Sequence, residues 1–323
     1  MEQPEILVSV ICNAYNHGPY IAAAMDGFLM QQTDFPVEIL VHDDASTDET
    51  AAVIRRYAAR YPEKILPVFQ EKNQYSQGVD INAAFQYPRV RGRYIAVCEG
   101  DDFWTDPRKL QRQVEAMEAH PEADLCAHAA ALLNAATGER IRAVAPRDRD
   151  GIIPPEEVIA GEGGFVATCS LLYRAELNRE VPRFRRELPL DYALQIQGSL
   201  RGGMIYLAEE MSAYRYLVPG SWSAQQQGAL ERRRRTLERR SRMLREVDRE
   251  TEGRFAPVIR ERILRSEFEF YYDEDLYAEA MGSAYRLFRR ELGWKSALNL
   301  WLKAKVPPVR RLLEARRQGR ADV

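Results

Sequence analysis

The first part of the chain alternates between short runs rich in β-branched residues and longer stretches with helical spacing. The short runs are residues 6–12, 37–41, 65–69 and 93–98, and a further apolar run covers 124–132. The spacing of apolar residues predicts helices at residues 20–31, 49–60 and 107–119. Strands separated by helices of this length indicate an α/β fold with a mostly parallel sheet, because a parallel connection needs a long crossover.

Polar clusters follow three of the predicted strands. They lie at residues 13–17, 43–48 and 99–102. Ligands of open parallel sheets bind beyond the carboxyl ends of the strands. We therefore expect the three clusters to converge on one edge of the sheet and to form a binding site there.

The near-neutral net charge of −2 hides two parts of opposite sign. Residues 1–228 contain 22 Lys and Arg against 32 Asp and Glu, whereas residues 229–323 contain 24 against 16. The basic part has few strand signals and predicts helices at residues 230–250, 256–272, 276–292 and 294–305. We expect an α/β domain over residues 1–225 and a basic helical extension over residues 226–323.

The cysteine spacing and the N-terminal residues indicate the cellular compartment of the protein. The four cysteines are Cys12, Cys98, Cys126 and Cys169; they form no CxxC pair and lie in apolar stretches, which favours buried free thiols. The uncharged residues 6–25 contain a polar, proline-bearing centre that a membrane span would not tolerate. No basic signal-peptide start precedes them, so we expect a cytoplasmic protein.

The acidic cluster Glu99-Gly-Asp-Asp102 directly follows a predicted buried strand. Clustered carboxylates repel one another, and Mg²⁺ or Mn²⁺ would relieve that repulsion because these ions prefer oxygen ligands. The alternative is a surface turn before the helix that Asp106-Pro107 begins. The second cluster, His42 to Asp48, is by itself equally typical of a loop with helix-capping residues.

Taken in order, three segments resemble the family 2 glycosyltransferases of the GT-A fold. They are VSVICNAYN at residues 8–16, VHDDASTD at 41–48 and CEGDD at 98–102. The following aromatic and Trp residues, with NQYSQG at 73–78, resemble an EGDD-type subgroup of that family. The resemblance covers roughly residues 5–225. It implies an inverting transfer of sugar from a nucleotide diphosphate sugar in polysaccharide or glycolipid assembly, and a UDP-sugar is the expected donor.

The resemblance implies roles for residues on the donor side. Asp44 matches the acid that contacts a uracil-type base, and Asp101 matches the acid that binds Mn²⁺ or Mg²⁺. The remaining matches to the nucleotide-binding segments are Ala14, Tyr15 and Asn16 beside the base, and Glu99 and Gly100 near the ribose or the waters of the metal.

On the acceptor side the resemblance places a general base in the second half of the domain. Asp191 matches this base, with Leu190 where Glu is common, although an Asp before the helix expected at 192–200 is also typical of a helix cap. Thr168 matches the acceptor-facing segment, and Asp102 either assists at the acceptor or caps the next helix.

Two positions depart from the family pattern. Ala45 stands where family members carry Gly, and Leu217 stands where many carry a His that touches the metal or diphosphate. His17 and His42 fall at the predicted nucleotide edge, where either contacts the ligand or serves as an ordinary loop or core histidine. Arg215 fits either a diphosphate contact or a structural role. A binding protein without transfer activity and a nucleotidyltransferase of related fold remain as alternatives, although the glycine-rich phosphate loop of the latter is missing.

The basic extension has three interpretations. It is a helical bundle in contact with solvent, an interfacial helix on an anionic membrane, or an oligomer contact through the aromatic residues 268–277. Its alternating Arg and Glu residues argue against nucleic acid. The residues that suit a membrane interface are Trp294, Leu298, Leu300, Trp301 and Leu302, with Lys295, Lys303, Lys305, Arg310 and Arg311.

Overall fold

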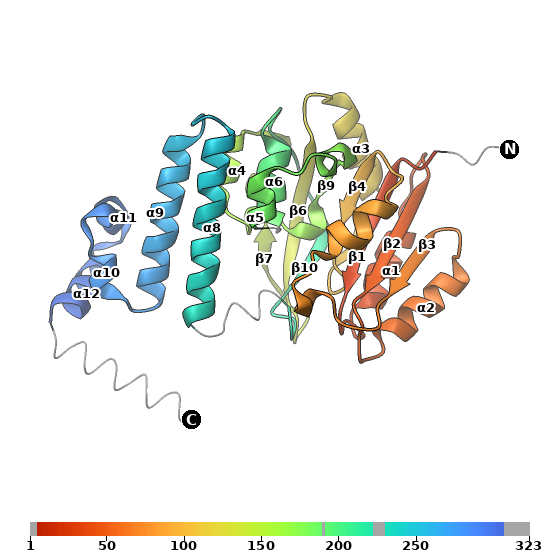
Figure 1. Ribbon diagram of the computed structural model, residues 1–323, viewed down its shortest axis with the longest axis horizontal. Helices are drawn as coiled ribbons and strands as arrows, with labels where there is room; N and C mark the ends of the chain where they lie inside the picture. The colour runs from red at the N-terminus through yellow and green to blue at the C-terminus, as the bar shows by residue number, and fades with distance from the viewer. Residues whose placement is uncertain (1–4, 189–190, 222–229, 307–323) are drawn as a thin grey trace. The chain divides into compact units, whose positions relative to one another are not determined.

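The computed structural model describes residues 5–188, 191–221 and 230–306, and the chain divides into two compact units, residues 1–227 and 228–323. The N-terminal unit is a ten-stranded sheet flanked by helices (Figure 1). Its strands are β1 Val8–Ala14, β2 Val37–Asp43, β3 Ile65–Phe69, β4 Tyr94–Val97, β5 Phe103–Trp104, β6 Leu125–Asn134, β7 Arg140–Val144, β8 Gly151–Ile153, β9 Leu172–Arg174 and β10 Met204–Tyr216. Its helices are α1 Ile21–Leu29, α2 Thr50–Arg60, α3 Lys109–Ala119, α4 Pro155–Gly161, α5 Arg183–Glu187 and α6 Asp191–Ser199.

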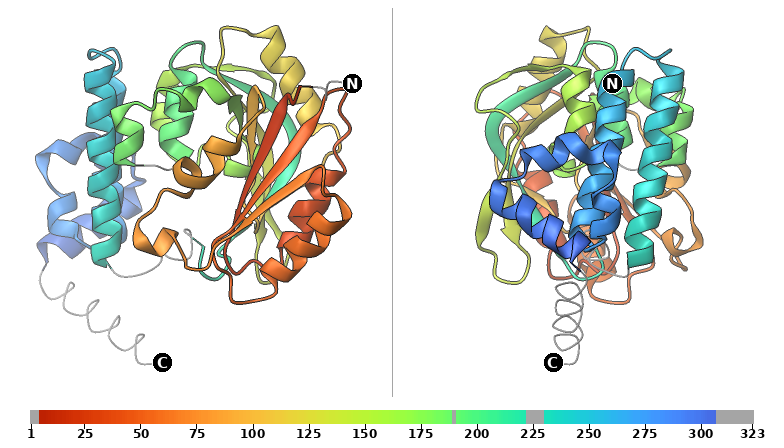
Figure 2. Two further views of the ribbon diagram at one scale, coloured as in Figure 1. Left: turned by 45° about the vertical axis from the view of Figure 1, so that its right-hand side comes forward. Right: turned by 90° about the vertical axis from the view of Figure 1, so that its left-hand side faces the viewer.

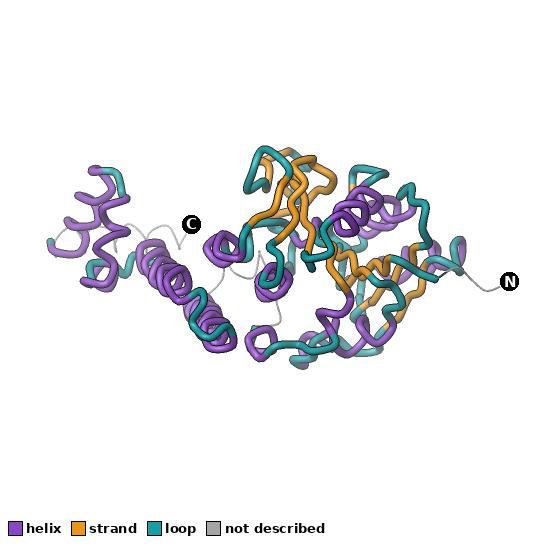
Figure 3. Tube along the Cα trace, turned by 90° about the horizontal axis from the view of Figure 1, so that it is seen from above, coloured by secondary structure: helices purple, strands orange, loops and turns teal. Residues whose placement is uncertain are grey.

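The strand order of the sheet is β3-β2-β1-β4-β9-β6-β10-β5, with β7 beside β6 and β8 beside β10. The strands β3, β2, β1 and β4 pair in parallel, as do β6 and β10, whereas β9 runs antiparallel to both of its neighbours. The twisted sheet has helices on both sides (Figures 2 and 3). The predicted α/β class is confirmed, and parallel pairing is concentrated in the half of the sheet that the first four strands form.

The apolar pattern of β1 explains its central place. Val8, Val10 and Cys12 are fully buried, as a strand covered on both faces requires. Ser9 is buried as well, and its hydroxyl donates a hydrogen bond of 2.6 Å to Glu38 on β2. The Glu38 carboxylate also accepts hydrogen bonds from the backbone N–H and the side chain of Arg91. These bonds offset the free-energy cost of burying the Ser9 hydroxyl and the Glu38 carboxylate.

The C-terminal unit is helical, as its sequence predicts. Its helices are α8 Leu230–Glu250, α9 Ala256–Asp273, α10 Tyr277–Ala280, α11 Arg286–Glu291 and α12 Trp294–Lys305. The long helices α8 and α9 lie side by side (Figure 1). The single helix predicted over residues 276–292 is wrong, because the backbone of Gly282 is extended (ψ 149°) between α10 and α11. Glycine favours such a break through its low helix propensity.

Two further expectations concern the thiols and membrane spans. All four cysteines are free and buried, as predicted. Within the described ranges, no helix combines the length and the apolar character that crossing a bilayer requires.

A buried lysine lies between α3 and the sheet. Lys109 has no exposed surface, and its ammonium group lies 4.0 Å from the centre of the Trp104 ring. Its Nζ donates a hydrogen bond of 2.8 Å to Gln113, whose amide in turn donates to the carbonyl of Ser170. Burial lowers the pKa of Lys109 to about 8, because the charged form loses hydration that these contacts replace only in part.

Lys109 predicts a contribution to stability that rises with pH. Between about pH 8 and the usual lysine pKa, the unfolded chain keeps this proton and the folded chain releases it. Lys109 should therefore contribute an increase of about 1–3 kcal/mol to the free energy of unfolding over this interval. The four buried cysteines oppose this increase, because burial raises their pKa. The quantity to measure by urea unfolding is therefore the wild-type value minus the Lys109→Met value, which should rise across the interval. Exposed Lys64 offers the control, since the wild-type value minus the Lys64→Met value should stay constant; a constant difference for Lys109→Met would contradict the assignment.

Candidate active site at the carboxyl edge of the sheet

The loops after β1 and β2 are tied to each other at the carboxyl edge. Asn16 donates its backbone N–H to Ser46 Oγ at 2.9 Å and accepts the N–H of Thr47 on its side-chain oxygen at 2.8 Å. Asp48 accepts the N–H of Gly18 at 2.9 Å and that of Thr50 at 2.9 Å, at the start of α2. Two of the three predicted polar clusters therefore form one connected unit, in which Asp48 caps α2.

The carboxylate of Asp44 is oriented by backbone N–H groups. It is 4% exposed and accepts from the N–H of Gln74 at 2.8 Å and from that of Tyr75 at 3.0 Å. Its own N–H donates to the carbonyl of Ala14 at 2.9 Å. These bonds fix the side chain in place before a ligand binds, and they connect it with the 73–78 segment that the sequence singles out.

The third cluster follows β4 and adjoins the first. Gly100 donates its N–H to the carbonyl of Asn13 at 2.9 Å. A Cβ atom on Gly100 would lie 2.8 Å from Ile21 and 3.1 Å from the side chain of Ala14, so only glycine allows the two loops to approach this closely. The acidic cluster thereby lies beside the loop that follows β1.

Burial and neighbouring negative charges raise the pKa of two acidic residues in this cluster, Glu99 and Asp102. Burial raises the pKa of Glu99 to about 8, and the negative charges of Asp101 and Asp191 add to the effect. Burial and then the charge of Asp101 raise the pKa of Asp102 well above its usual value. Because Asp191 acts on Glu99, the predicted base belongs to the same electrostatic site as the predicted metal ligand.

Asp102 and Arg215 hold the acidic loop against β10. Asp102 is 1% exposed and accepts the backbone N–H of Arg215 at 2.8 Å. The guanidinium of Arg215 donates to the carbonyl of Asp101 at 2.6 Å and lies 4.4 Å from the centre of the Phe103 ring. Of the two roles considered for Arg215, these contacts support the structural one. Asp106, rather than Asp102, accepts the N–H of Arg108 before α3, and acceptor contact by Asp102 stays a prediction.

Asp191 begins α6 and is bonded to a second predicted residue. Thr168 Oγ1 donates to one oxygen of Asp191 at 2.5 Å, and the other oxygen accepts the N–H of Tyr192 at 2.7 Å. The structure thus joins two residues that the sequence places 23 positions apart. Leu190 lies outside the described residues.

Comparison with known proteins identifies the family. A model of the family described as glycosyl transferase family 2 matches residues 9–160. The chain belongs to glycosyltransferase family 2. An uncharacterized protein of Mycobacterium tuberculosis is 35% identical over 216 residues, which are 67% of this chain and 60% of that protein. The putative teichuronic acid biosynthesis glycosyltransferase TuaG of Bacillus subtilis is 36% identical over 111 residues, 34% of this chain and 42% of TuaG.

Solved glycosyltransferase structures share the fold. The crystal structure of S. aureus TarS 1–349 superposes with a TM-score of 0.61 at 16% identity, covering 94% of this chain and 82% of that one. The same TarS segment in complex with UDP-GlcNAc superposes with a TM-score of 0.61 at 14% identity, covering 97% and 92%. The chain therefore has the GT-A fold of these glycosyltransferases, and it spans less than two thirds of its mycobacterial relative.

His17 lies beside the acidic cluster, at a position where the sequence predicts either a contact with the nucleotide or an ordinary histidine. The Nε2 atom of His17 lies 3.8 Å from an oxygen of Asp101. Its position in the turn after β1, at the predicted nucleotide edge, is the signal in the sequence that points to it. His42, in contrast, is fully buried, stacks on Phe85 at 5.1 Å and contacts Gln70, as a core histidine does.

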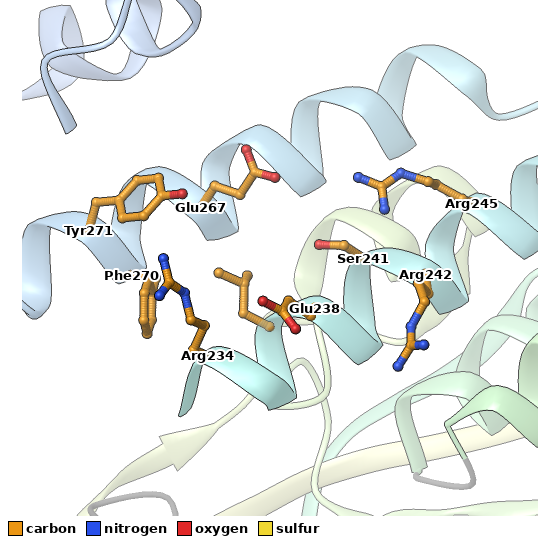
Figure 4. Close-up of a pocket in the computed structure, with 9 residues that line it drawn as sticks. Arg234, Glu238, Ser241, Arg242, Arg245, Glu267, Phe270 and Tyr271 are labelled. Carbon is orange, nitrogen blue, oxygen red and sulfur yellow. The ribbon is translucent and has the colours of Figure 1, made fainter. Parts of the chain in front are cut away.

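The C-terminal unit carries a separate groove of about 430 Å³ between α8 and α9 (Figure 4). Arg234, Arg242 and Arg245 line it from α8, and Phe270 and Tyr271 line it from α9. None of the predicted donor or acceptor residues lines this groove. The carboxyl edge of the sheet, where the ionisable groups converge, is therefore the candidate active site.

Ala45, which stands where family members carry Gly, has a strained backbone in the loop after β2. Ala45 has a φ of +61°, a conformation that glycine adopts without strain. Ala45→Gly should stabilise the chain by about 0.5–1 kcal/mol in urea unfolding, because relief of strain outweighs the entropy of an added glycine. Ala52→Gly, within α2, is the matched control and should destabilise by about 1 kcal/mol. Equal destabilisation by the two changes would contradict the strain at Ala45.

Proposed function

We propose that this chain transfers a sugar from a nucleotide diphosphate sugar to an acceptor hydroxyl, with inversion at the anomeric carbon. The observation that carries the proposal is the convergence of Asp44, the Glu99–Asp102 loop and Asp191 on one edge of the sheet. Family membership supports the reaction class. The UDP-GlcNAc complex of TarS supports a UDP-sugar donor, and the name of TuaG supports a role in polysaccharide assembly.

The donor side lies at the ends of β1, β2 and β4. Asp44, oriented by two N–H groups, would accept a hydrogen bond from the base, with Ala14, Tyr15 and Asn16 beside it. Tyr15 is 44% exposed, so its ring is available to a ligand. Glu99 and Gly100 would then lie near the ribose, because they adjoin the same loop.

Asp101 offers one carboxylate ligand to a divalent cation, and the described residues contain no group of three or more His, Cys, Asp or Glu side chains that could hold a metal ion by themselves. The acidic loop concentrates negative charge strongly enough to raise the pKa of Glu99, and the nearby guanidinium of Arg215 is already bonded to a backbone carbonyl. Asp101 would hold Mn²⁺ or Mg²⁺ through its carboxylate. A bound cation would offset the negative charge that grows on the leaving diphosphate.

On the acceptor side, Asp191 would take the hydroxyl proton as the new glycosidic bond forms and the bond to the diphosphate breaks. The hydrogen bonds from Thr168 and from the N–H of Tyr192 hold the Asp191 carboxylate in one orientation. A base and a nucleophile on the side opposite the leaving group give a single displacement, which inverts the anomeric carbon.

Asp191→Asn should abolish transfer and retain donor binding. The amide has the shape of the carboxylate but cannot accept the proton, so we expect turnover to fall by about a hundredfold or more. Thr168→Val should lower turnover less, because the base remains but loses its orientation. The measurements are release of UDP in the presence of an acceptor and calorimetric titration with UDP-GlcNAc.

Asp101→Asn should differ from Asp191→Asn, because loss of the proposed metal ligand should weaken metal-dependent binding of the nucleotide as well as turnover. Unaltered turnover in Asp191→Asn would remove the base assignment. Binding of nucleotide sugars by the wild type without transfer to any saccharide or lipid-linked acceptor would favour the alternative of a binding protein.

We further propose that α12 contacts an anionic membrane surface, where lipid-linked acceptors are found. Trp294, Leu298 and Trp301 lie at i, i+4 and i+7 and are 73%, 50% and 47% exposed, so one apolar face is open to solvent. Exposed Lys295 and Lys305 are on the same helix.

The burial of residues in the C-terminal unit changes two of the interpretations drawn from its sequence. The predicted membrane contact of Leu300 is wrong, since this residue is 1% exposed in the core of the unit. Phe268 and Tyr277 belong to the same core, which argues against an oligomer contact through them. Arg310 and Arg311 lie outside the described residues.

The double change Trp294→Ala, Trp301→Ala should weaken binding to vesicles of phosphatidylglycerol and phosphatidylcholine by at least about tenfold, because two interfacial aromatic groups are lost. Co-sedimentation measures this. The double change Ile141→Ala, Ile152→Ala removes exposed apolar residues of the N-terminal unit and should leave vesicle binding unaltered. Equal sedimentation of all three proteins would contradict the membrane proposal.

A further inference from the structure

His17 occupies a constrained position at the start of α1. Its carbonyl accepts the N–H groups of Tyr20 and Ile21, both at 2.8 Å, which fixes its backbone at the helix entry. Its side chain is 14% exposed, and Nε2 lies 3.8 Å from the Oδ2 atom of Asp101. The imidazole therefore has one nitrogen directed toward the acidic loop.

The hydrogen bonds of the protein do not account for this ring orientation. In the part of the chain that the structure describes, Nδ1 of His17 is buried and has no hydrogen-bond partner. A Cβ on Gly100 would lie 2.9 Å from Nδ1, so the ring is packed closely against that glycine. The separation of Nε2 from Asp101 exceeds hydrogen-bond length, which leaves both ring nitrogens without a hydrogen bond inside the described chain.

We propose that His17 and Asp101 together ligate the divalent cation that holds the donor diphosphate. This inference rests on the proposed function. Two donor atoms that are each about 2.1 Å from one octahedral ion lie about 3.0 Å apart when they are adjacent ligands. The observed separation of 3.8 Å would therefore have to shorten by about 0.8 Å when the ion binds. His17 would supply its imidazole from the loop after β1.

The chemistry of this pair predicts a metal preference. A site with one imidazole and one carboxylate favours Mn²⁺ over Mg²⁺, because Mg²⁺ prefers oxygen ligands throughout. His17→Gln replaces the imidazole with an amide that offers an oxygen. The change should therefore weaken Mn²⁺ binding more than Mg²⁺ binding. A simple ion pair between protonated His17 and Asp101 makes the opposite prediction, because removing the histidine would free the carboxylate for either ion.

The test is electron spin-echo spectroscopy of Mn²⁺ bound to the full chain in the presence of UDP. The wild type should show magnetic coupling of an imidazole nitrogen to Mn²⁺. His17→Gln should lose this coupling and bind Mn²⁺ with UDP at least about tenfold more weakly. His120→Gln is the matched control, since His120 is an exposed histidine of the same unit, 3.0 Å from Glu122, and should retain both properties.

The outcomes separate this inference from the function on which it rests. A wild-type complex with Mn²⁺ and UDP that shows no nitrogen coupling would overturn the role of His17 and leave the proposed transferase intact. Coupling that persists in His17→Gln would overturn it equally. Failure of the wild type to bind any of UDP, UDP-GlcNAc or Mn²⁺ would overturn both proposals. The spectrum of the wild type decides the matter even if His17→Gln does not fold.

Discussion

The parallel pairing of β1 with β2 on one side and β4 on the other is the constraint on which the rest of the site depends. Because all three strands run in the same direction, their carboxyl ends meet at one edge and their loops become neighbours. The hydrogen bonds from Asp44 to Ala14 and from Gly100 to Asn13 then join those loops. A buried Ser9–Glu38 contact supports the same central strand from within.

This arrangement has an electrostatic cost. Burial and the nearby charge of Asp101 raise the pKa of Glu99 and Asp102, and the charge of Asp191 adds to the effect at Glu99. Arg215 offsets only part of this charge, and its guanidinium is bonded to the backbone. Groups in such an arrangement suit a divalent cation, since its positive charge relieves the repulsion that the protein alone retains.

Much of this could be predicted from local patterns. The buried runs and helical spacings predicted the elements of the N-terminal unit, and the resemblance placed Asp101 and Asp191 in ordered motifs. Other features depend on contacts between residues far apart in the chain. The bond of Thr168 to Asp191, the use of the N–H groups of Gln74 and Tyr75 by Asp44, and the break at Gly282 have no unambiguous local signal.

The sequence by itself determined the α/β class, the sign of charge in each part and the chemical types gathered at the strand ends, because periodicity and composition are local properties. Only the tertiary structure decided which groups meet. It placed His17 beside Asp101, assigned Arg215 to a structural role and buried Leu300 while exposing Trp301. These outcomes depend on strand order, loop closure and helix rotation, which arise from packing between distant segments and so leave no pattern in any one of them.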